Sequence, residues 1–306
     1  MIAIGIVREY LALTASELGA LDPERTVFFV AIGPLEVHGP HLPLGTDIFV
    51  AEDLRDRYVE DFLKRYPGHS AVVLPTVPIG GDALPMNGSL DVSARDLEGF
   101  LVAWGRGLSR GGFRYLVVAD NHGGPRHLLA AEAASRTLWR RHHVALLNPF
   151  VEEFRRMVDL DEELLDSVEM DAGRVGDLSD LHAGTNETSL ALASDRILPV
   201  DDYTGLPRRD PPPPGRVAGT MASLLGLLGA RRLSMEVRRL GSVIAWAGSE
   251  GPGYIGAPGE ASSEAGERMI AYRAEVAAEM IDRILAGESP AARPPLWPLR
   301  LLRYLP

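Results

Sequence analysis

Short apolar segments alternate with longer amphipathic segments through the first half of the chain. The apolar ones stop at glycine, proline or polar residues and read as buried strands: Thr26–Ile32, Ala71–Leu74, Arg114–Ala119 and Val144–Leu147. The amphipathic ones read as helices: Phe49–Tyr66, Ala94–Ser109 and His127–Arg141, with two more expected at Asn186–Ala193 and Ser262–Ala286. This alternation predicts an α/β fold whose parallel sheet is covered by helices on both faces. Ligands of such folds bind at the carboxyl ends of the strands.

Composition narrows the chemistry that is open to this fold. The chain has 306 residues, no cysteine and a formal net charge of −11. Without cysteine, any reactive centre must use His, Asp, Glu or Ser. The acidic balance argues against nucleic acid as a partner. The N-terminal segment does not resemble a signal peptide, and no apolar run would span a membrane, so we expect a cytoplasmic protein with no membrane partner.

The loop after the first strand holds three potential metal ligands. Glu36 and His38 are two residues apart, so in extended backbone they point the same way. Glycines and prolines between residues 39 and 45 then turn the chain back and bring Asp47 toward the same point. The two carboxylate oxygens of Asp47 would suit a bridge between two ions. The alternative for Asp47 is a cap on the helix that follows; the nearby Glu36 and His38 favour the ligand.

The loop after the third strand adds a histidine. His122 follows that strand and precedes two glycines, which leaves its ring approachable at the predicted crevice. We therefore interpret His122 as a metal ligand, with a purely structural histidine as the alternative. His127 lies one turn into the next helix and is expected to point elsewhere.

A third segment places a histidine and a carboxylate on either side of a glycine turn that opens a helix. Glu187 is predicted as a metal ligand and His182 as a proton shuttle that works near neutral pH. The alternatives are an ordinary first-turn charge for Glu187 and a buried, hydrogen-bonded imidazole for His182. The spacing also allows Asp180 to orient His182.

The predicted ligand set contains only carboxylates and imidazoles: Glu36, His38, Asp47, His122 and Glu187. Such a set suits two divalent cations, Zn²⁺ first, with Mn²⁺ and Fe²⁺ as alternatives. A metal pair lowers the pKa of a bridging water and polarises a carbonyl group. We therefore expect an amidohydrolase that cleaves a C–N bond with a metal-bound hydroxide, with His182 and Asp180 as its catalytic residues.

Three strings resemble the signatures of the creatininase family: EVHGPHLPLGTD at 36–47, NHGG at 121–124 and HAGTNETS at 182–189. The resemblance extends over roughly residues 5–285. It implies an α/β/α sandwich around a central, mainly parallel sheet, a dinuclear metal centre and a homo-oligomer, often a hexamer. We assign residues 1–289 to this single domain and residues 290–306 to a proline-rich C-terminal tail.

The resemblance also implies a role for each ligand. Asp47 would bridge the two metal ions. Glu36 and His122 would hold one ion, and His38 and Glu187 the other. His182 would donate a proton to the leaving nitrogen.

Some positions depart from the family pattern near the substrate. Pro125 replaces an asparagine, and creatinine-cleaving members have aromatic and acidic side chains where this chain has Leu178 and Gly124. None of these changes replaces a predicted metal ligand, but they alter the substrate pocket. We therefore expect a small cyclic or linear amide other than creatinine as the substrate. The alternatives are a formamide deformylase or a peptide-trimming enzyme and, in a different class, a noncatalytic binding scaffold.

Two proline-rich segments lie outside these motifs. Asp210–Gly215 is expected to form a stiff loop within the domain. We interpret the tail at 290–306 as a spacer, with packing on a neighbouring subunit as the alternative.

Overall fold

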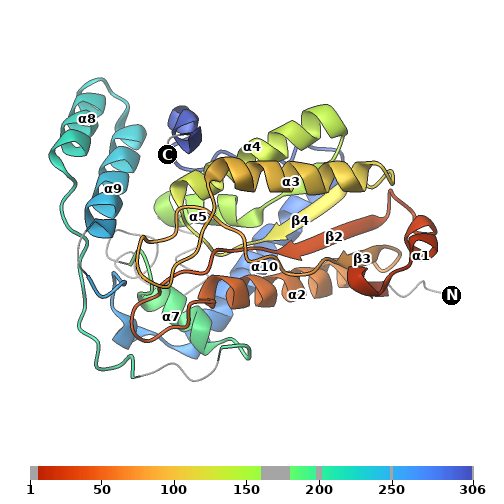
Figure 1. The fold of residues 1–306 in the computed structure, drawn as a ribbon, viewed down its shortest axis with the longest axis horizontal. Coiled ribbons are helices and arrows are strands. Elements are labelled where there is room, and N and C mark those ends of the chain that lie inside the picture. The colour runs from red at the N-terminus through yellow and green to blue at the C-terminus, as the bar shows by residue number, and fades with distance from the viewer. Residues whose placement is uncertain (1–5, 160–179, 198–201, 249–250, 305–306) are drawn as a thin grey trace.

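A five-stranded, fully parallel sheet forms the centre of the molecule (Figure 1). The computed structural model describes residues 6–159, 180–197, 202–248 and 251–304. The strands are ordered β1-β3-β2-β4-β5 across the sheet. Their bounds are β1 (Ile6–Glu9), β2 (Thr26–Ala31), β3 (Ser70–Val73), β4 (Tyr115–Ala119) and β5 (Ala145–Leu147). The α/β class and the parallel sheet predicted from the sequence are confirmed.

Helices cover both faces of the sheet and make three layers. Along β2, Val27 and Phe29 face one side while Phe28 and Val30 face the other, and all four are buried. The first side packs against α2 (Thr46–Arg65), α7 (Thr185–Leu192) and α10 (Ser263–Leu285), and the second against α3 (Ala94–Ser109) and α4 (Pro125–His142). The shorter elements are η1 (Tyr10–Ala12), α1 (Ala15–Gly19), α5 (Pro149–Asp159), η2 (Pro258–Glu260) and η3 (Trp297–Tyr304).

The strand order places a functional crevice between β2 and β4. The chain leaves β2 for β3 on one side and then returns to β4 on the other, so neighbouring connections diverge between β2 and β4. Such a divergence opens a crevice outside the carboxyl ends of the two strands. The loops that carry Glu36 and His122 follow these two strands directly, which brings their side chains to one place.

Local capping explains where several helices begin. The Ser93 hydroxyl accepts a hydrogen bond from the Asp96 N–H at 3.2 Å, and Ser262 caps α10 in the same way. The predicted start of α2 at Phe49 was three residues late, since the helix begins at Thr46 with Gly45 as its N-cap. Asp47 therefore lies within the first turn, and the capping alternative for it is wrong.

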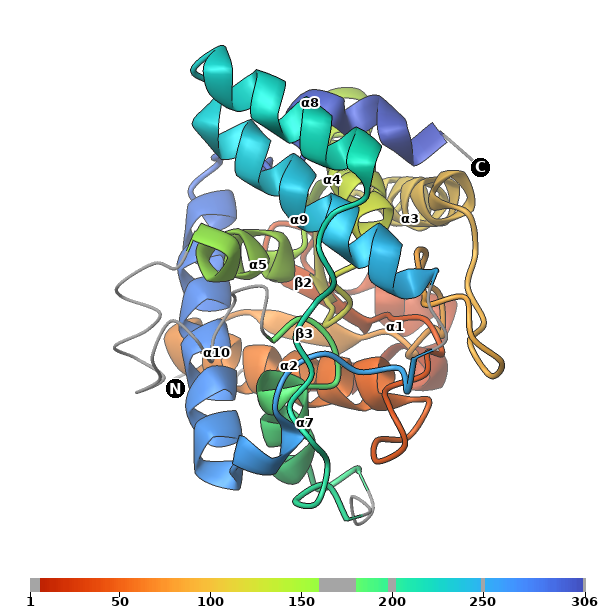
Figure 2. The same cartoon turned by 90° about the vertical axis from the view of Figure 1, so that its left-hand side faces the viewer.

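A helical hairpin that the sequence pattern did not predict projects from the body of the molecule (Figures 1 and 2). It consists of α8 (Arg216–Leu227) and α9 (Arg231–Ala247), and the Asp210–Gly215 segment is the irregular stretch that leads into it. A Cβ on Gly241 would overlap Ala218, so a glycine is needed where the two helices touch. Within the described ranges, no helix is long and apolar enough to cross a bilayer.

The described part of the tail, up to residue 304, is folded onto its own chain and does not form a spacer. Its helix η3 packs against α3 and α4. Arg303 forms an ion pair with Glu98 at 3.0 Å, and the Arg136 guanidinium lies over the Trp297 ring, 4.3 Å from its centroid. Leu296 is buried against α8 and α9. The tail thus joins the hairpin to the main body.

The contact between α10 and α7 generates a stability prediction. A Cβ on Gly266, near the start of α10, would overlap the backbone carbonyl of Ser189 in α7. We expect Gly266→Ala to lower the free energy of unfolding by about 1–3 kcal/mol, because the two helices must separate. Gly99→Ala is the control, since Gly99 is exposed in α3 with open space around it; helix propensity should raise its stability by about 0.5–1 kcal/mol. Urea unfolding followed by circular dichroism measures both, and equal stabilities would contradict the close contact.

Candidate metal centre

A tight loop after β2 brings three polar side chains into the crevice. The Glu36 N–H donates to the Leu44 carbonyl at 2.9 Å, and His38 forms a bridge with Leu42, so the chain doubles back within nine residues. Gly39 turns with a φ of +67°, a left-handed conformation that favours glycine. The return places Asp47, on the first turn of α2, beside Glu36 and His38, as the sequence predicted.

The predicted ligands meet in two groups that share one carboxylate. Glu36, Asp47 and His122 form one group, and His38, Asp47 and Glu187 form the other. Within each group, one potential ligand atom from each residue lies within 4.8 Å of the others. All five side chains predicted from three separate loops are therefore brought together, with Asp47 between the two groups.

Backbone carbonyls fix which nitrogen of each histidine ring is available. His38 Nδ1 donates to the Glu36 carbonyl at 3.0 Å, His122 Nε2 to the Gly81 carbonyl at 2.9 Å and His182 Nε2 to the Val37 carbonyl at 2.8 Å. A carbonyl oxygen only accepts, so each of these nitrogens carries the hydrogen. In a neutral ring the opposite nitrogen then holds a lone pair, which is the form that binds metal.

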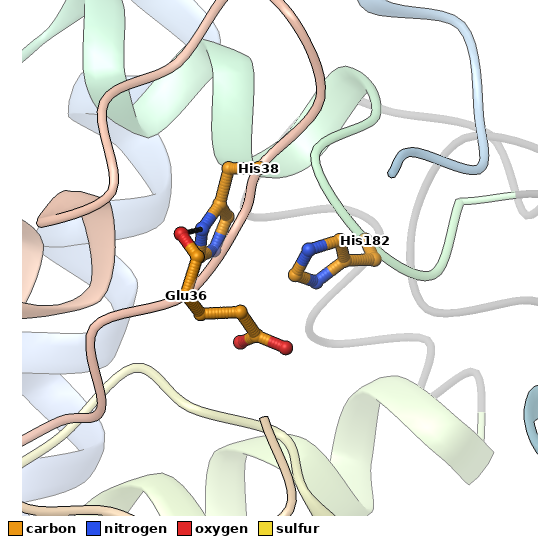
Figure 3. Close-up of side chains that lie close together, drawn as sticks. All are labelled: Glu36, His38 and His182. Carbon is orange, nitrogen blue, oxygen red and sulfur yellow. Dashed lines mark hydrogen bonds between the residues drawn. The ribbon is translucent and has the colours of Figure 1, made fainter. Parts of the chain in front are cut away.

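The free nitrogens point at the carboxylates. His122 Nδ1 lies 3.0 Å from Glu36 Oε2 and 3.3 Å from Asp47 Oδ2. His38 Nε2 lies 3.7 Å from both Asp47 Oδ1 and Glu187 Oε2. Figure 3 shows Glu36 and His38 on one loop and His182 on another, directed toward a common region.

Several buried atoms of this cluster make no hydrogen bond within the described residues. They are Glu36 Oε2, His38 Nε2 and Asp47 Oδ2, on residues that are at most 2 % exposed. An unpaired buried polar atom is destabilising, and an unpaired buried charge more so. The three atoms are the ones that two cations sharing Asp47 would take as ligands, so the residues present fit a dinuclear metal site.

Mutual attraction keeps the carboxylates ionised despite their burial. Burial alone would raise the pKa of Glu36, but the charge and hydrogen bond of His122 together with other nearby groups outweigh it, and the pKa falls to about 2. Burial likewise opposes the charged form of His38, yet Asp47, Glu187 and Glu36 together raise its pKa to about 10. For Asp47, burial is outweighed by His38 and His122 together, and its pKa lies well below the usual range. At neutral pH the carboxylates are therefore in the anionic form that attracts cations.

A buried relay supports Asp47 from behind. The Asn121 side-chain amide donates to Asp47 Oδ1 at 3.2 Å, and Arg273 Nη1 donates to Asn121 Oδ1 at 2.7 Å. Arg273, on α10, is 5 % exposed and its Nε lies 3.6 Å from Glu153 Oε2. The relay orients the amide and thereby the carboxylate. The sequence analysis included Asn121 only as part of the motif around His122, and no sequence pattern predicted a role for Arg273.

The segment that leads into α7 supplies the two remaining predicted residues, Asp180 and His182. Asp180 accepts hydrogen bonds from the backbone N–H groups of Thr185 and Asn186, at 2.6 and 2.9 Å, and so fixes the start of the helix that carries Glu187. His182 Nδ1 lies 3.8 Å from Glu187 Oε2. Asp180 thus supports Glu187 through the helix, and its predicted orienting of His182 remains a prediction.

Two histidines outside the ligand set stabilise the loops around it. His41 Nε2 lies 2.9 Å from the Thr188 hydroxyl, and burial together with the charge of His38 lowers the pKa of His41 to about 4. His127 belongs to none of the ligand groups among the described residues, but its ring lies 5.1 Å from that of His122. Its Nε2 lies 2.8 Å from Asp120 Oδ2, and its Nδ1 accepts from the Gly81 N–H. Since the Gly81 carbonyl holds His122, His127 has a supporting role that the sequence did not reveal. Leu178, noted as a family departure, lies outside the described residues.

The family comparison covers most of the chain. The model of the family described as "Creatininase: Creatinine amidohydrolase" matches residues 12–281. A curated relative from Mycolicibacterium smegmatis, the mycofactocin precursor peptide peptidase, is 35% identical over 123 residues. That match covers 40% of this chain and spans only 48% of the relative's length.

Solved structures show the same fold at low identity. A structure described as "Creatininase Mn" has a TM-score of 0.61 and 20% identity, covering 92% of this chain and 99% of its own. A mutant creatininase of "Zn-Zn type" has a TM-score of 0.59 and 20% identity, covering 90% and 98%. With a family match over residues 12–281, the chain belongs to the creatininase family.

Proposed function

We propose that this protein is a metal-dependent amidohydrolase that hydrolyses the C–N bond of an amide other than creatinine, using two divalent cations per chain. The observation that carries the proposal is the pair of ligand groups that share Asp47. Membership of the creatininase family supports it. A dinuclear arrangement of this kind is typical of hydrolases that must activate water and polarise a carbonyl in one site.

The proposed ligands divide between the two ions. Glu36 and His122 would hold one ion, His38 and Glu187 the other, and Asp47 would bridge them. Imidazole and carboxylate ligands suit Zn²⁺, with Mn²⁺ and Fe²⁺ as alternatives. The fold neighbours, one described with Mn and one with Zn, are consistent with either of the first two metals.

The chain's own residues orient the reaction. Bound ions would polarise the amide carbonyl and lower the pKa of a water between them. The hydrogen bond from Nε2 to the Val37 carbonyl holds the His182 ring and leaves a lone pair on Nδ1, so that Nδ1 could accept a proton from the attacking water and pass it to the leaving nitrogen. Asp180 keeps the first turn of α7 in place, and with it Glu187.

Among the alternatives, the peptide-trimming function has support of its own, because the relative from Mycolicibacterium smegmatis is named a precursor peptide peptidase. A formamide deformylase would use the same centre on a smaller substrate. A noncatalytic scaffold is disfavoured, since it would keep three buried ligand atoms without a hydrogen bond, at a cost in stability and without using them. A homo-oligomer, with a hexamer as the family implies, and a cytoplasmic location remain predictions.

Metal binding should depend on Asp47. We expect wild-type protein, loaded with zinc and desalted, to retain close to two ions per chain in elemental analysis. Asp47→Ala should lose both, because each ligand group loses a member. Asp61→Asn is the control, since Asp61 lies on the same helix and pairs with Arg57 away from the cluster. If the wild-type protein retains no metal ions after loading with zinc, the proposed function is wrong.

His182 should be needed for turnover and not for metal. We expect His182→Ala to keep both ions and to lower kcat by about 10²–10⁴-fold, the usual contribution of a positioned proton donor. A panel of lactams, formamides and short peptides supplies the assay, with His142→Ala at the end of α4 as the control. Loss of an ion from His182→Ala would instead make His182 a ligand, in the group that it forms with Glu36 and His38.

The relay behind Asp47 should tune metal affinity. We expect Asn121→Ala and Arg273→Gln each to raise the metal Kd by about 10–100-fold, as is usual for groups that orient a ligand. Because Arg273 acts through Asn121, the double variant should be little weaker than either single one. Arg283→Gln, an exposed change on the same helix, is the control. Fully additive losses in a calorimetric metal titration would show that the two residues act separately.

A further inference from the structure

One face of α9 lines the cleft that contains the metal centre. Its cleft-lining residues follow helical spacing: Glu236, Arg239, Leu240, Val243 and Trp246. A second face of α9, with Val237 and Gly241, packs against α8. Ile244 is not among the described residues that line the cleft, and it is 62 % exposed. The hairpin therefore builds part of the site and is more than an appendage of the fold.

The same cleft is apolar on surfaces contributed by other elements. Phe150 and Phe154 of α5 line it, with their ring centroids 5.7 Å apart, and so does Leu128 of α4. We call these three residues, together with Leu240, Val243 and Trp246 of α9, the apolar lining. An apolar surface of this kind gains more from contact with an apolar group than from contact with a small polar ring.

Contacts at both ends hold α9 in place over the metal centre. Near its start, the Glu236 carboxylate accepts a hydrogen bond from the Leu296 N–H at 2.9 Å, which ties the helix to the folded tail. Near its end, the Trp246 ring lies 5.5 Å from the His182 ring and packs with Leu84 and Ile255. The apolar lining is therefore preformed and reaches the residue proposed as proton donor.

We propose that the apolar lining is a subsite for a bulky apolar side chain beside the scissile bond, so that the substrate is a peptide-like amide carrying a leucine- or phenylalanine-type residue. This inference rests on the proposed amidohydrolase function. Burial of such a side chain would remove apolar surface of both partners from water. A charged side chain would lose its hydration there. The Glu236 carboxylate is already engaged by the Leu296 N–H and by Arg232.

The first experiment measures side-chain preference with the zinc-loaded full chain. The substrates are dipeptides with glycine, alanine, leucine, phenylalanine or glutamate on either side of the amide, and N-hexanoyl glycine as an acyl-chain probe. We expect kcat/KM to rise by about 4-fold for each buried methylene, or roughly 50-fold from alanine to leucine, and to fall for glutamate. Cleavage of the acyl-chain probe without that of the peptides would overturn the peptide assignment.

A pair of adjacent substitutions locates the subsite. Val243→Asp should reduce kcat/KM for the leucine substrate at least 10-fold more than for the glycine substrate, because the carboxylate opposes burial of an apolar group. Ile244→Asp introduces the same charge one residue away on the exposed face and should leave the preference intact. Val243→Thr keeps the shape of the side chain, so it tests the subsite should the aspartate variant be unstable. Equal effects of the changes at 243 and 244 would overturn the proposal.

The outcomes separate this inference from the proposed function. If the zinc-loaded protein cleaves none of these amides nor any of the lactams and formamides, the amidohydrolase function fails and the subsite fails with it. If it cleaves the peptides with equal kcat/KM for glycine, alanine and leucine, only the subsite fails. If kcat/KM rises with side-chain size, and if Val243→Asp removes this preference while Ile244→Asp keeps it, the result supports both the amidohydrolase function and the subsite.

Discussion

The structure depends on how three carboxylates are kept close together in a buried crevice. Glu36 and Asp47 are almost fully buried, and Glu187 faces the same histidine as Asp47. Like charges in such a setting repel one another strongly, because little water is present to screen them. The imidazoles of His38 and His122 and the guanidinium of Arg273 counter this repulsion. Two divalent cations would add further positive charge at the same place, so the electrostatics as well as the ligand types support the proposed metal site.

The rest of the fold serves to hold those charges in register. Because β2 and β4 are parallel neighbours, the loops that follow them lie at one crevice. Helix α7 places Glu187 at the same crevice. Backbone carbonyls then fix each histidine ring, which costs no additional buried charge. The hydrogen bond of His122 to Gly81 and that of His38 to Glu36 are of this kind. The ligands are thus positioned mainly by the backbone, which the sheet and its helices make rigid.

Much of this arrangement was predictable from the sequence, for a physical reason. The strands are continuous apolar runs, and Glu36, His38, Asp47 and His122 lie within short segments that follow them, where local turns decide the direction of the chain. Arg273 was not predictable, since its contact with Asn121 joins residues 152 positions apart and its sequence context is that of an ordinary amphipathic helix. Helix α9 was not predicted, although Val237, Leu240 and Ile244 recur at helical spacing along it.

The ligand cluster and the apolar lining differ in how they are built because they have different geometric requirements. A metal centre needs fixed distances between several charged atoms, and the proposed ligands lie on the loops after β2 and β4 and on the first turns of α2 and α7. An apolar subsite needs only surface of suitable shape and polarity, because the hydrophobic effect is not directional. A hairpin attached at its ends by Glu236 and Trp246 meets that need without disturbing the ligands. We therefore expect substitutions on the cleft-facing side of α9 to change the preference for substrate and to leave the proposed metal ligands in place.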